Sequence, residues 1–219
     1  MSIEMRLSGF LFLFIIITNI LSNFFGYKTV GDLKSDLNAK LQRINNDPKK
    51  FKISVVLIII EHVSIIFLAV MLFIAFSPFN ILLGVIWTIS RIVEGSIQIY
   101  DKKNYYGLLN IAKQYSDASG AEKNELFDLG RSILITKDSI FTFAQILFSI
   151  GTLAYSILFV TYEAVPVFIG WFGIVVSIVY GLGNGIKFVK PNFEVLAMFG
   201  GLLVLLFEIV LGGWLLFFS

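Results

Sequence analysis

Long apolar stretches alternate with shorter polar segments along the chain. A helix that crosses the hydrocarbon core of a bilayer, which is about 30 Å thick, needs about 20 mostly apolar residues. Six stretches reach this length, so the sequence predicts an all-α fold: a six-helix transmembrane bundle that makes residues 1–219 a single multi-pass membrane domain. The expected spans cover residues 7–25, 53–76, 80–99, 138–160, 166–187 and 193–218.

The two long polar segments between these spans carry a helical pattern of their own. Apolar residues recur among charges at intervals of three and four, which is typical of an amphipathic helix. We therefore expect amphipathic cytoplasmic helices between spans one and two and between spans three and four, lying on the inner leaflet or capping the bundle. The apolar positions are Val30, Leu33, Leu37, Leu41 and Ile44 in the first segment, and Tyr105, Leu108, Leu109, Ala112, Tyr115, Leu126, Leu129 and Ile133 in the second.

Basic residues are concentrated in alternate gaps between the spans. The gaps at 26–52 and 100–137, together with Lys187 and Lys190, hold 15 of the 17 lysines and arginines. Loops rich in Lys and Arg stay in the cytoplasm. We therefore expect these gaps to be cytoplasmic, both termini to lie outside, and the protein to reside in the cell (inner) membrane.

The composition excludes several classes of function. The chain has no cysteine and one histidine, so disulfides, thiol nucleophiles and two-histidine metal motifs are excluded. A net charge of +2 does not indicate a nucleic-acid partner. We expect no metal and no cofactor; membrane lipid is the expected partner, and no particular protein partner is indicated.

Ionisable residues inside the spans are the candidates for chemistry. A charge near the centre of a bilayer costs from about 3 to more than 10 kcal/mol, so such residues face the interior of a bundle and find partners there. Four residues meet this description, and four uncharged or weakly basic polar residues within the six spans add to them. They are Glu61, Arg91, Glu94 and Glu208, with His62, Gln98, Gln145 and Tyr180.

Counting along the spans places several of these residues at one depth. Glu61 and Arg91 each lie eight residues from the cytoplasmic end of their span, or about 12 Å deep at 1.5 Å per residue. Gln145 and Tyr180 lie about 10 Å deep by the same count. Glu208 lies about 22 Å from the cytoplasmic end and should line the outer half.

Two interpretations of this polar layer are open. In the first it forms a buried pocket, where Arg91 holds an anionic group through its planar guanidinium while Glu94 and Glu61 balance the charge or take up protons. In the second, Arg91 and the glutamates form a structural ion pair that locks the second helix to the third. The predicted ligand-binding residues are Arg91, Glu94, Glu61, His62, Gln98, Gln145, Tyr180 and Glu208, and no catalytic residue is predicted.

Four segments carry a resemblance to a known family. They are RLSGFLFL at 6–13, SRIVE at 90–94, PVFIGWFG at 166–173 and FEIVLGGWL at 207–215. In this order and spacing they resemble the prokaryotic multi-pass membrane family catalogued as domain of unknown function 4386, over almost the whole chain. The resemblance implies the same topology and places the family's polar positions on Arg91, Glu94 and Glu208, but it implies no defined activity. The family usually has a single acidic residue in its second helix, where this chain has Glu61 followed by His62.

The leading functional hypothesis is a multi-pass membrane protein that binds a small or lipid-like anionic ligand in this pocket, for transport or sensing. One alternative is a membrane-embedded enzyme acting on a lipid or isoprenoid, with Glu61 and His62 as acid and base. Adjacent residues on a helix point in different directions, which counts against that pairing. The other alternative is an assembly subunit that docks a partner through its cytoplasmic loops.

Overall fold

The computed structural model describes residues 2–27 and 36–218, and these residues are almost entirely helical. The predicted all-α class is confirmed. Six of the helices are long and apolar enough to cross a membrane, which agrees with the predicted six-helix bundle of a multi-pass membrane protein. The elements are α1 (Ile3–Ser22), the π-helical turn η1 (Asn23–Tyr27), α3 (Leu37–Asn46), α4 (Pro48–Phe76), α5 (Ile81–Asp117), α6 (Gly120–Tyr162), α7 (Val167–Val189) and α8 (Val195–Phe217).

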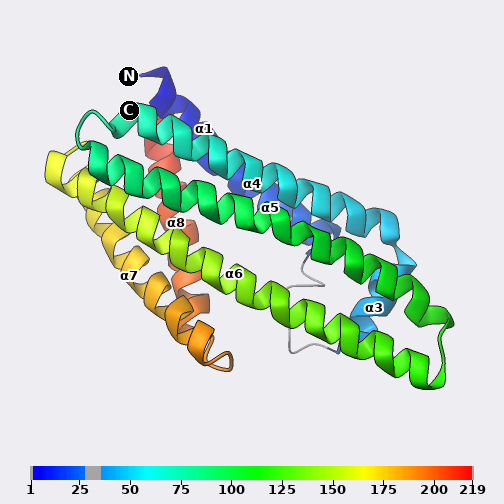
Figure 1. Ribbon diagram of the computed structural model, residues 1–219. Coiled ribbons are helices and arrows are strands. Elements are labelled where there is room, and N and C mark those ends of the chain that lie inside the picture. The colour runs from blue at the N-terminus through cyan, green and yellow to red at the C-terminus, as the bar shows by residue number, and fades with distance from the viewer. Residues whose placement is uncertain (1, 28–35, 219) are drawn as a thin grey trace.

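The six long helices form a closed ring. Each packs mainly against the helix before it and the helix after it, and α1 closes the ring by packing against α8. Both termini lie at one end of the bundle, and the tip of the α5–α6 hairpin lies at the other (Figure 1). The tight turns at 77–80 and 163–166 lie at the end with the termini, where the side-chain amide of Asn80 caps α5 and also donates to the hydroxyl of Tyr162 over 3.1 Å.

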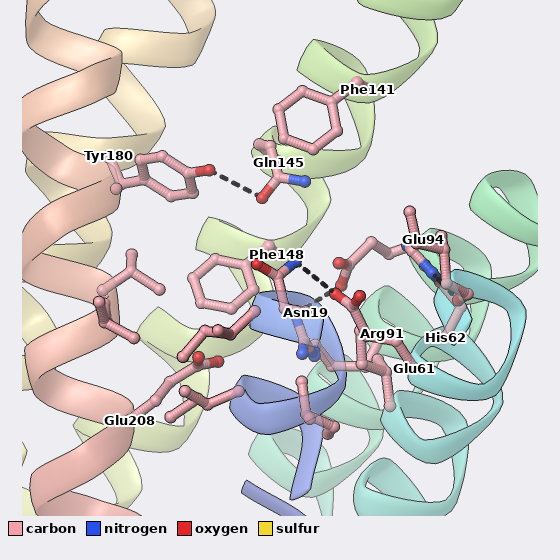
Figure 2. Close-up of a pocket in the computed structure, with 18 of the residues that line it drawn as sticks. Asn19, Glu61, His62, Arg91, Glu94, Phe141, Gln145, Phe148, Tyr180 and Glu208 are labelled. Carbon is pink, nitrogen blue, oxygen red and sulfur yellow. Dashed lines mark hydrogen bonds and ion pairs between the residues drawn. The ribbon is translucent and has the colours of Figure 1, made fainter. Parts of the chain in front are cut away.

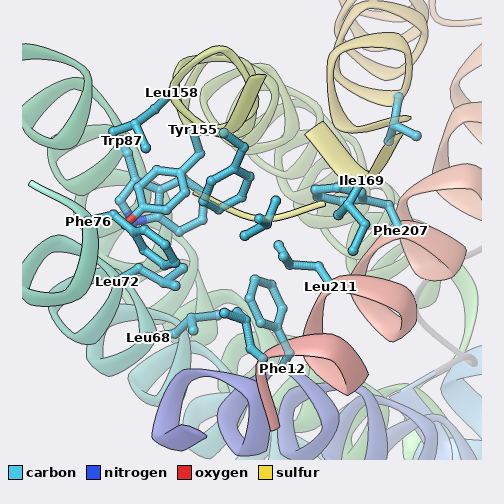
Figure 3. Packing of buried hydrophobic residues seen from close by; sticks show 14 of the residues in the cluster. Phe12, Leu68, Leu72, Phe76, Trp87, Tyr155, Leu158, Ile169, Phe207 and Leu211 are labelled. Carbon is cyan, nitrogen blue, oxygen red and sulfur yellow. The ribbon is translucent and has the colours of Figure 1, made fainter. Parts of the chain in front are cut away.

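Aromatic side chains fill the ring at the end with the termini (Figure 3). Phe76, Tyr155 and Phe159 meet edge to face, with ring centroids 5.0 to 5.7 Å apart. Trp87 lies against Tyr155 at 4.5 Å. We call this half of the ring the sealed half; it is defined by Phe12, Leu68, Leu72, Phe76, Trp87, Tyr155, Phe159, Ile169, Phe207 and Leu211.

Two glycines let α1 and α8 touch in the sealed half. A Cβ atom on Gly9 would lie 2.4 Å from the backbone nitrogen of Leu216, and one on Gly212 would lie 2.7 Å from Cβ of Phe12. Small residues of this kind allow membrane helices to approach closely enough for their backbones to contact. The ring is therefore closed tightly at this end.

Two helices are longer than the spans predicted for them. The 37 residues of α5 and the 43 residues of α6 extend for about 55 and 64 Å, roughly twice the thickness of the hydrocarbon core. The separate amphipathic helices expected over 105–115 and 126–133 are continuations of these two spans. The chain between each span and its extension contains no glycine or proline that would interrupt a helix.

The extensions and α3 form a second apolar core outside the ring. Leu41, Ile44, Tyr105 and Leu108 are each at most 2% exposed in it. The amphipathic faces therefore pack against one another and do not lie flat on a membrane surface. Leu129, expected on the apolar face, is 51% exposed because the face of α6 that turns inward passes through Leu126, Gly130 and Leu134. The expected positions Val30 and Leu33 lie outside the described residues.

Candidate functional site

A cavity of about 450 Å³ occupies the ring beside the sealed half (Figure 2). We call this part of the bundle the hollow half. All six ring helices contribute to its lining. The walls are apolar, with polar groups directed inward at several points. The polar lining residues are Asn19, Asn23, Glu61, His62, Arg91, Glu94, Gln145, Tyr180 and Glu208.

Arg91 lies on the boundary between the two halves. Its Nη1 donates to Oε2 of Glu94 at 2.6 Å, an ion pair between residues three apart on one face of α5. The guanidinium lies 4.5 Å from the ring centroid of Phe148 and 5.4 Å from that of Trp87, within range of cation–π attraction. The side chain is 2% exposed, yet its Nε has no hydrogen-bond partner among the described residues. Arg91 is thus held firmly and retains an unused donor.

Glu61 is held by a helix that sequence analysis did not associate with it. Its Oε1 accepts a hydrogen bond of 3.0 Å from Nδ2 of Asn19 on α1, whereas its buried Oε2 has no partner in the described part of the chain. The ion pair of Arg91 is made to Glu94 within α5, so it does not lock the second span to the third as the second interpretation supposed. Glu61 joins α4 to α1 and leaves one oxygen available.

His62 lines the cavity but does not form an acid–base pair with Glu61. Its Nδ1 lies 2.7 Å from the carbonyl oxygen of Ile58, one turn earlier on the same helix. Glu61 makes its hydrogen bond to α1 instead. The two adjacent side chains therefore have different partners, as their positions on α4 predict.

Gln145 and Tyr180 join two neighbouring helices across the wall of the cavity. The hydroxyl of Tyr180 on α7 donates to Oε1 of Gln145 on α6 over 2.9 Å. Gln98 is the one predicted site residue that does not line this cavity. It is 1% exposed and lies one turn beyond Glu94 on α5, toward the extension.

Glu208 lines the same cavity as Arg91, although the depth estimate placed it apart in the outer half. The estimate assumed parallel helices, whereas α8 crosses the bundle at an angle to α4 and α5 (Figure 1). In Figure 2 the Glu208 carboxyl group lies across the cavity from Arg91 and Glu61. It makes no hydrogen bond to another described residue.

Sequence reasoning missed three residues of the site. Asn19 and Asn23 are polar residues at the end of the first apolar stretch. Gln98 was selected because it is a polar residue inside a predicted span, and the same criterion would have selected these two asparagines. Phe148 lies three residues after Gln145, on the same face of α6, and its ring centroid is 4.5 Å from the guanidinium of Arg91. No signal in the sequence distinguishes Phe148 from the other phenylalanines.

The arrangement suits recognition of a ligand. In the described part of the chain, no group of three or more His, Cys, Asp or Glu side chains is placed to hold a metal ion. The cavity instead offers a guanidinium with an unused donor and two carboxylates with unused acceptors. Its volume lies within the range of about 300 to 1,000 Å³ that is usual for small-molecule pockets.

Comparison with known proteins identifies the family and no more. The model of the family described as Domain of unknown function (DUF4386) matches residues 7–218, so the chain belongs to that family. No curated protein matches the chain. No solved structure matches it either.

Proposed function

We propose that this member of the DUF4386 family binds a small or lipid-like ligand in the hollow half, with Arg91 holding an anionic group of that ligand. The observation that carries the proposal is the cavity itself: a space of about 450 Å³ lined by Arg91 and Glu61, each of which has a buried polar atom without a hydrogen-bond partner among the described residues. An unsatisfied buried polar group costs about 1 to 3 kcal/mol. A ligand that pairs with Nε of Arg91 and Oε2 of Glu61 removes that cost, and binding of this kind would serve transport or sensing.

Two features favour binding over the alternatives. The residues suggested as an acid–base pair, Glu61 and His62, have separate partners, so this pair is not positioned for the proton transfer that the enzymatic alternative requires. The apolar faces of α3 and of the α5 and α6 extensions are used in their own core, and docking would need such a face left free.

The proposal is tested by native mass spectrometry of the protein extracted from its membrane in a mild detergent. Wild type is expected to retain a bound molecule, and Arg91→Met to lose it about 10- to 100-fold, because a hydrogen bond to a charged group is worth about 1.5 to 3 kcal/mol. A second variant combines Arg91→Met with Glu94→Met, so that Glu94 is not left as a buried carboxylate without its ion-pair partner and the fold is preserved. Gln98→Leu, on the same helix but outside the cavity, should retain the molecule. Equal retention by all four proteins would refute the proposal.

We also propose that the protein lies in the cell membrane with both termini outside and the α5–α6 tip in the cytoplasm. The support is the concentration of basic residues in the segments that α3 and the two extensions contain. Because the chain has no cysteine, single substitutions Ser2→Cys and Lys123→Cys can be labelled in intact cells with a membrane-impermeant maleimide. Ser2→Cys should react and Lys123→Cys should not, and the reverse pattern would invert the proposed orientation.

A further inference from the structure

The cavity is lined on its exposed side by residues of α1 and α8. The lining residues from α4 and α5 are all buried. The two lining residues that are exposed are Ile20 on α1, at 61%, and Leu205 on α8, at 38%. We call the line between these two residues the seam.

The seam opens because α1 and α8 touch closely at one end only. Gly9 and Gly212 bring the helices together in the sealed half, and α8 is inclined to α1 (Figure 1). On the hollow side of α8, Gly201 lines the cavity without a side chain, and a Cβ there would lie 3.6 Å from Cε2 of Tyr180. The absence of a side chain at this position leaves room for a chain of methylene groups.

The apolar surroundings of the seam indicate which class of ligand could enter the cavity there. Both helices are membrane spans, so the exposed apolar side chains of Ile20 and Leu205 face the hydrocarbon of the bilayer. An acyl chain lies among such side chains without losing hydration, whereas a water-soluble ligand would have to be dehydrated before entering. Resting on the function proposed above, we propose that the ligand is an amine-bearing phospholipid taken sideways from the bilayer through this seam. Its head group lies in the cavity and its acyl chains leave through the seam.

The charges in the cavity select the head group. Arg91 and Glu94 neutralise each other as a pair, which leaves the carboxyl groups of Glu61 and Glu208. A phosphate alone would find a spare donor on Arg91 but would face two further acidic groups. A head group that also carries an ammonium group donates to those acids, so phosphatidylethanolamine matches the lining better than phosphatidylglycerol.

The test uses vesicles of equal parts phosphatidylethanolamine and phosphatidylglycerol, with a photoactivatable diazirine placed in the acyl chain of one lipid at a time. Cross-linked peptides are mapped by mass spectrometry. We expect adducts from the ethanolamine lipid to be enriched at least about tenfold at the seam over Leu182, which faces outward on α7 and reports background contact with lipid. The glycerol lipid should show weaker enrichment.

Matched variants test whether the space beside the seam is needed for the adducts. Gly201→Trp places a large side chain in the cavity next to the seam and should abolish the enrichment, whereas Gly213→Trp, on the same helix where an added Cβ meets nothing within 4 Å, should leave it unchanged. Both variants are checked for a thermal midpoint close to that of wild type. If Gly201→Trp proves unstable, the adduct map of wild type by itself decides the route.

The outcomes distinguish failure of this inference from failure of the proposed function. Loss of seam adducts in the Arg91→Met, Glu94→Met double variant supports both. Retention of a molecule that depends on Arg91, with adducts spread evenly over the outer surface, overturns sideways entry and leaves the binding function standing. Displacement of the lipid by free glycerophosphoethanolamine added in water also overturns the lipid source. Equal enrichment with both lipids overturns the choice of head group.

Discussion

The sealed half and the hollow half are built from the same six helices but differ in how far their inward-facing side chains fill the space between the helices. On α5, Trp87 belongs to the aromatic cluster and Arg91, one turn later, lines the cavity. On α8, Leu211 packs in the cluster, whereas Gly201 faces the cavity without a side chain. Lipid tails are as apolar as leucine, so helices in a bilayer are held together by van der Waals packing and hydrogen bonds. The sealed half supplies much of that packing, whereas the side chains of the hollow half leave a space between the helices.

The contrast explains how a membrane bundle can hold a cavity of about 450 Å³. Each atom that faces a void loses its dispersion contacts on that side. The aromatic cluster and the glycine contacts of α1 with α8 fix the positions of the helices at one end, so side chains at the other end need not close the space. The hollow half is then free to carry polar groups and an opening.

The largest effect should come from removing an aromatic ring in the sealed half. Phe159 is completely buried and contacts both Phe76 and Tyr155. Phe159→Ala should lower the free energy of unfolding by about 3 to 5 kcal/mol, because a buried ring is lost and a void remains. Unfolding by SDS titration in mixed micelles measures the change.

Phe141→Ala is the matched control on the same helix. Phe141 lines the existing cavity and is half-buried, so its removal enlarges a space that is already there. The expected loss is under about 1 kcal/mol. Similar losses for the two variants would show that the hollow half contributes as much packing as the sealed half.

Features that depend on one helix alone could be predicted from the sequence, whereas features that depend on how the helices are placed could not. The apolar lengths predict the six spans, because the bilayer sets the length of a helix. Because the rise per residue of a helix is constant, counting residues placed Glu61 and Arg91 at one depth. Both line the cavity, as that count predicts. That counting could not supply the tilt of α8, which brings Glu208 to the cavity, or show that Gln98 does not line the cavity.

Two further features depend on packing between distant parts of the chain. The hydrogen bond from Asn19 to Glu61 joins residues 42 positions apart, and no local pattern predicts it. The cation–π contact of Arg91 with Phe148 joins α5 to α6. The extensions of α5 and α6 were predicted as helices, but only their contacts with α3 show that their apolar faces are covered.

A smaller effect should follow from separating α1 and α8 where they touch. Gly9→Val places side-chain atoms where the backbone of Leu216 lies, and backbone atoms cannot move aside as a flexible side chain can. Overpacking of this kind costs about 1 to 3 kcal/mol. The thermal midpoint of the purified protein in detergent should fall accordingly.

Gly213→Val adds the same side chain on α8 where nothing lies within 4 Å, so it introduces no clash, and valine has a slightly higher helix propensity than glycine. If closure at Gly9 holds the ring together, Gly9→Val should lower the thermal midpoint clearly more than Gly213→Val does. It should also widen the seam, so that bound lipid exchanges faster in Gly9→Val than in wild type. An unchanged midpoint in Gly9→Val would mean that the two helices are not in contact there, and the sealed half would then extend only over α4, α5, α6 and α7.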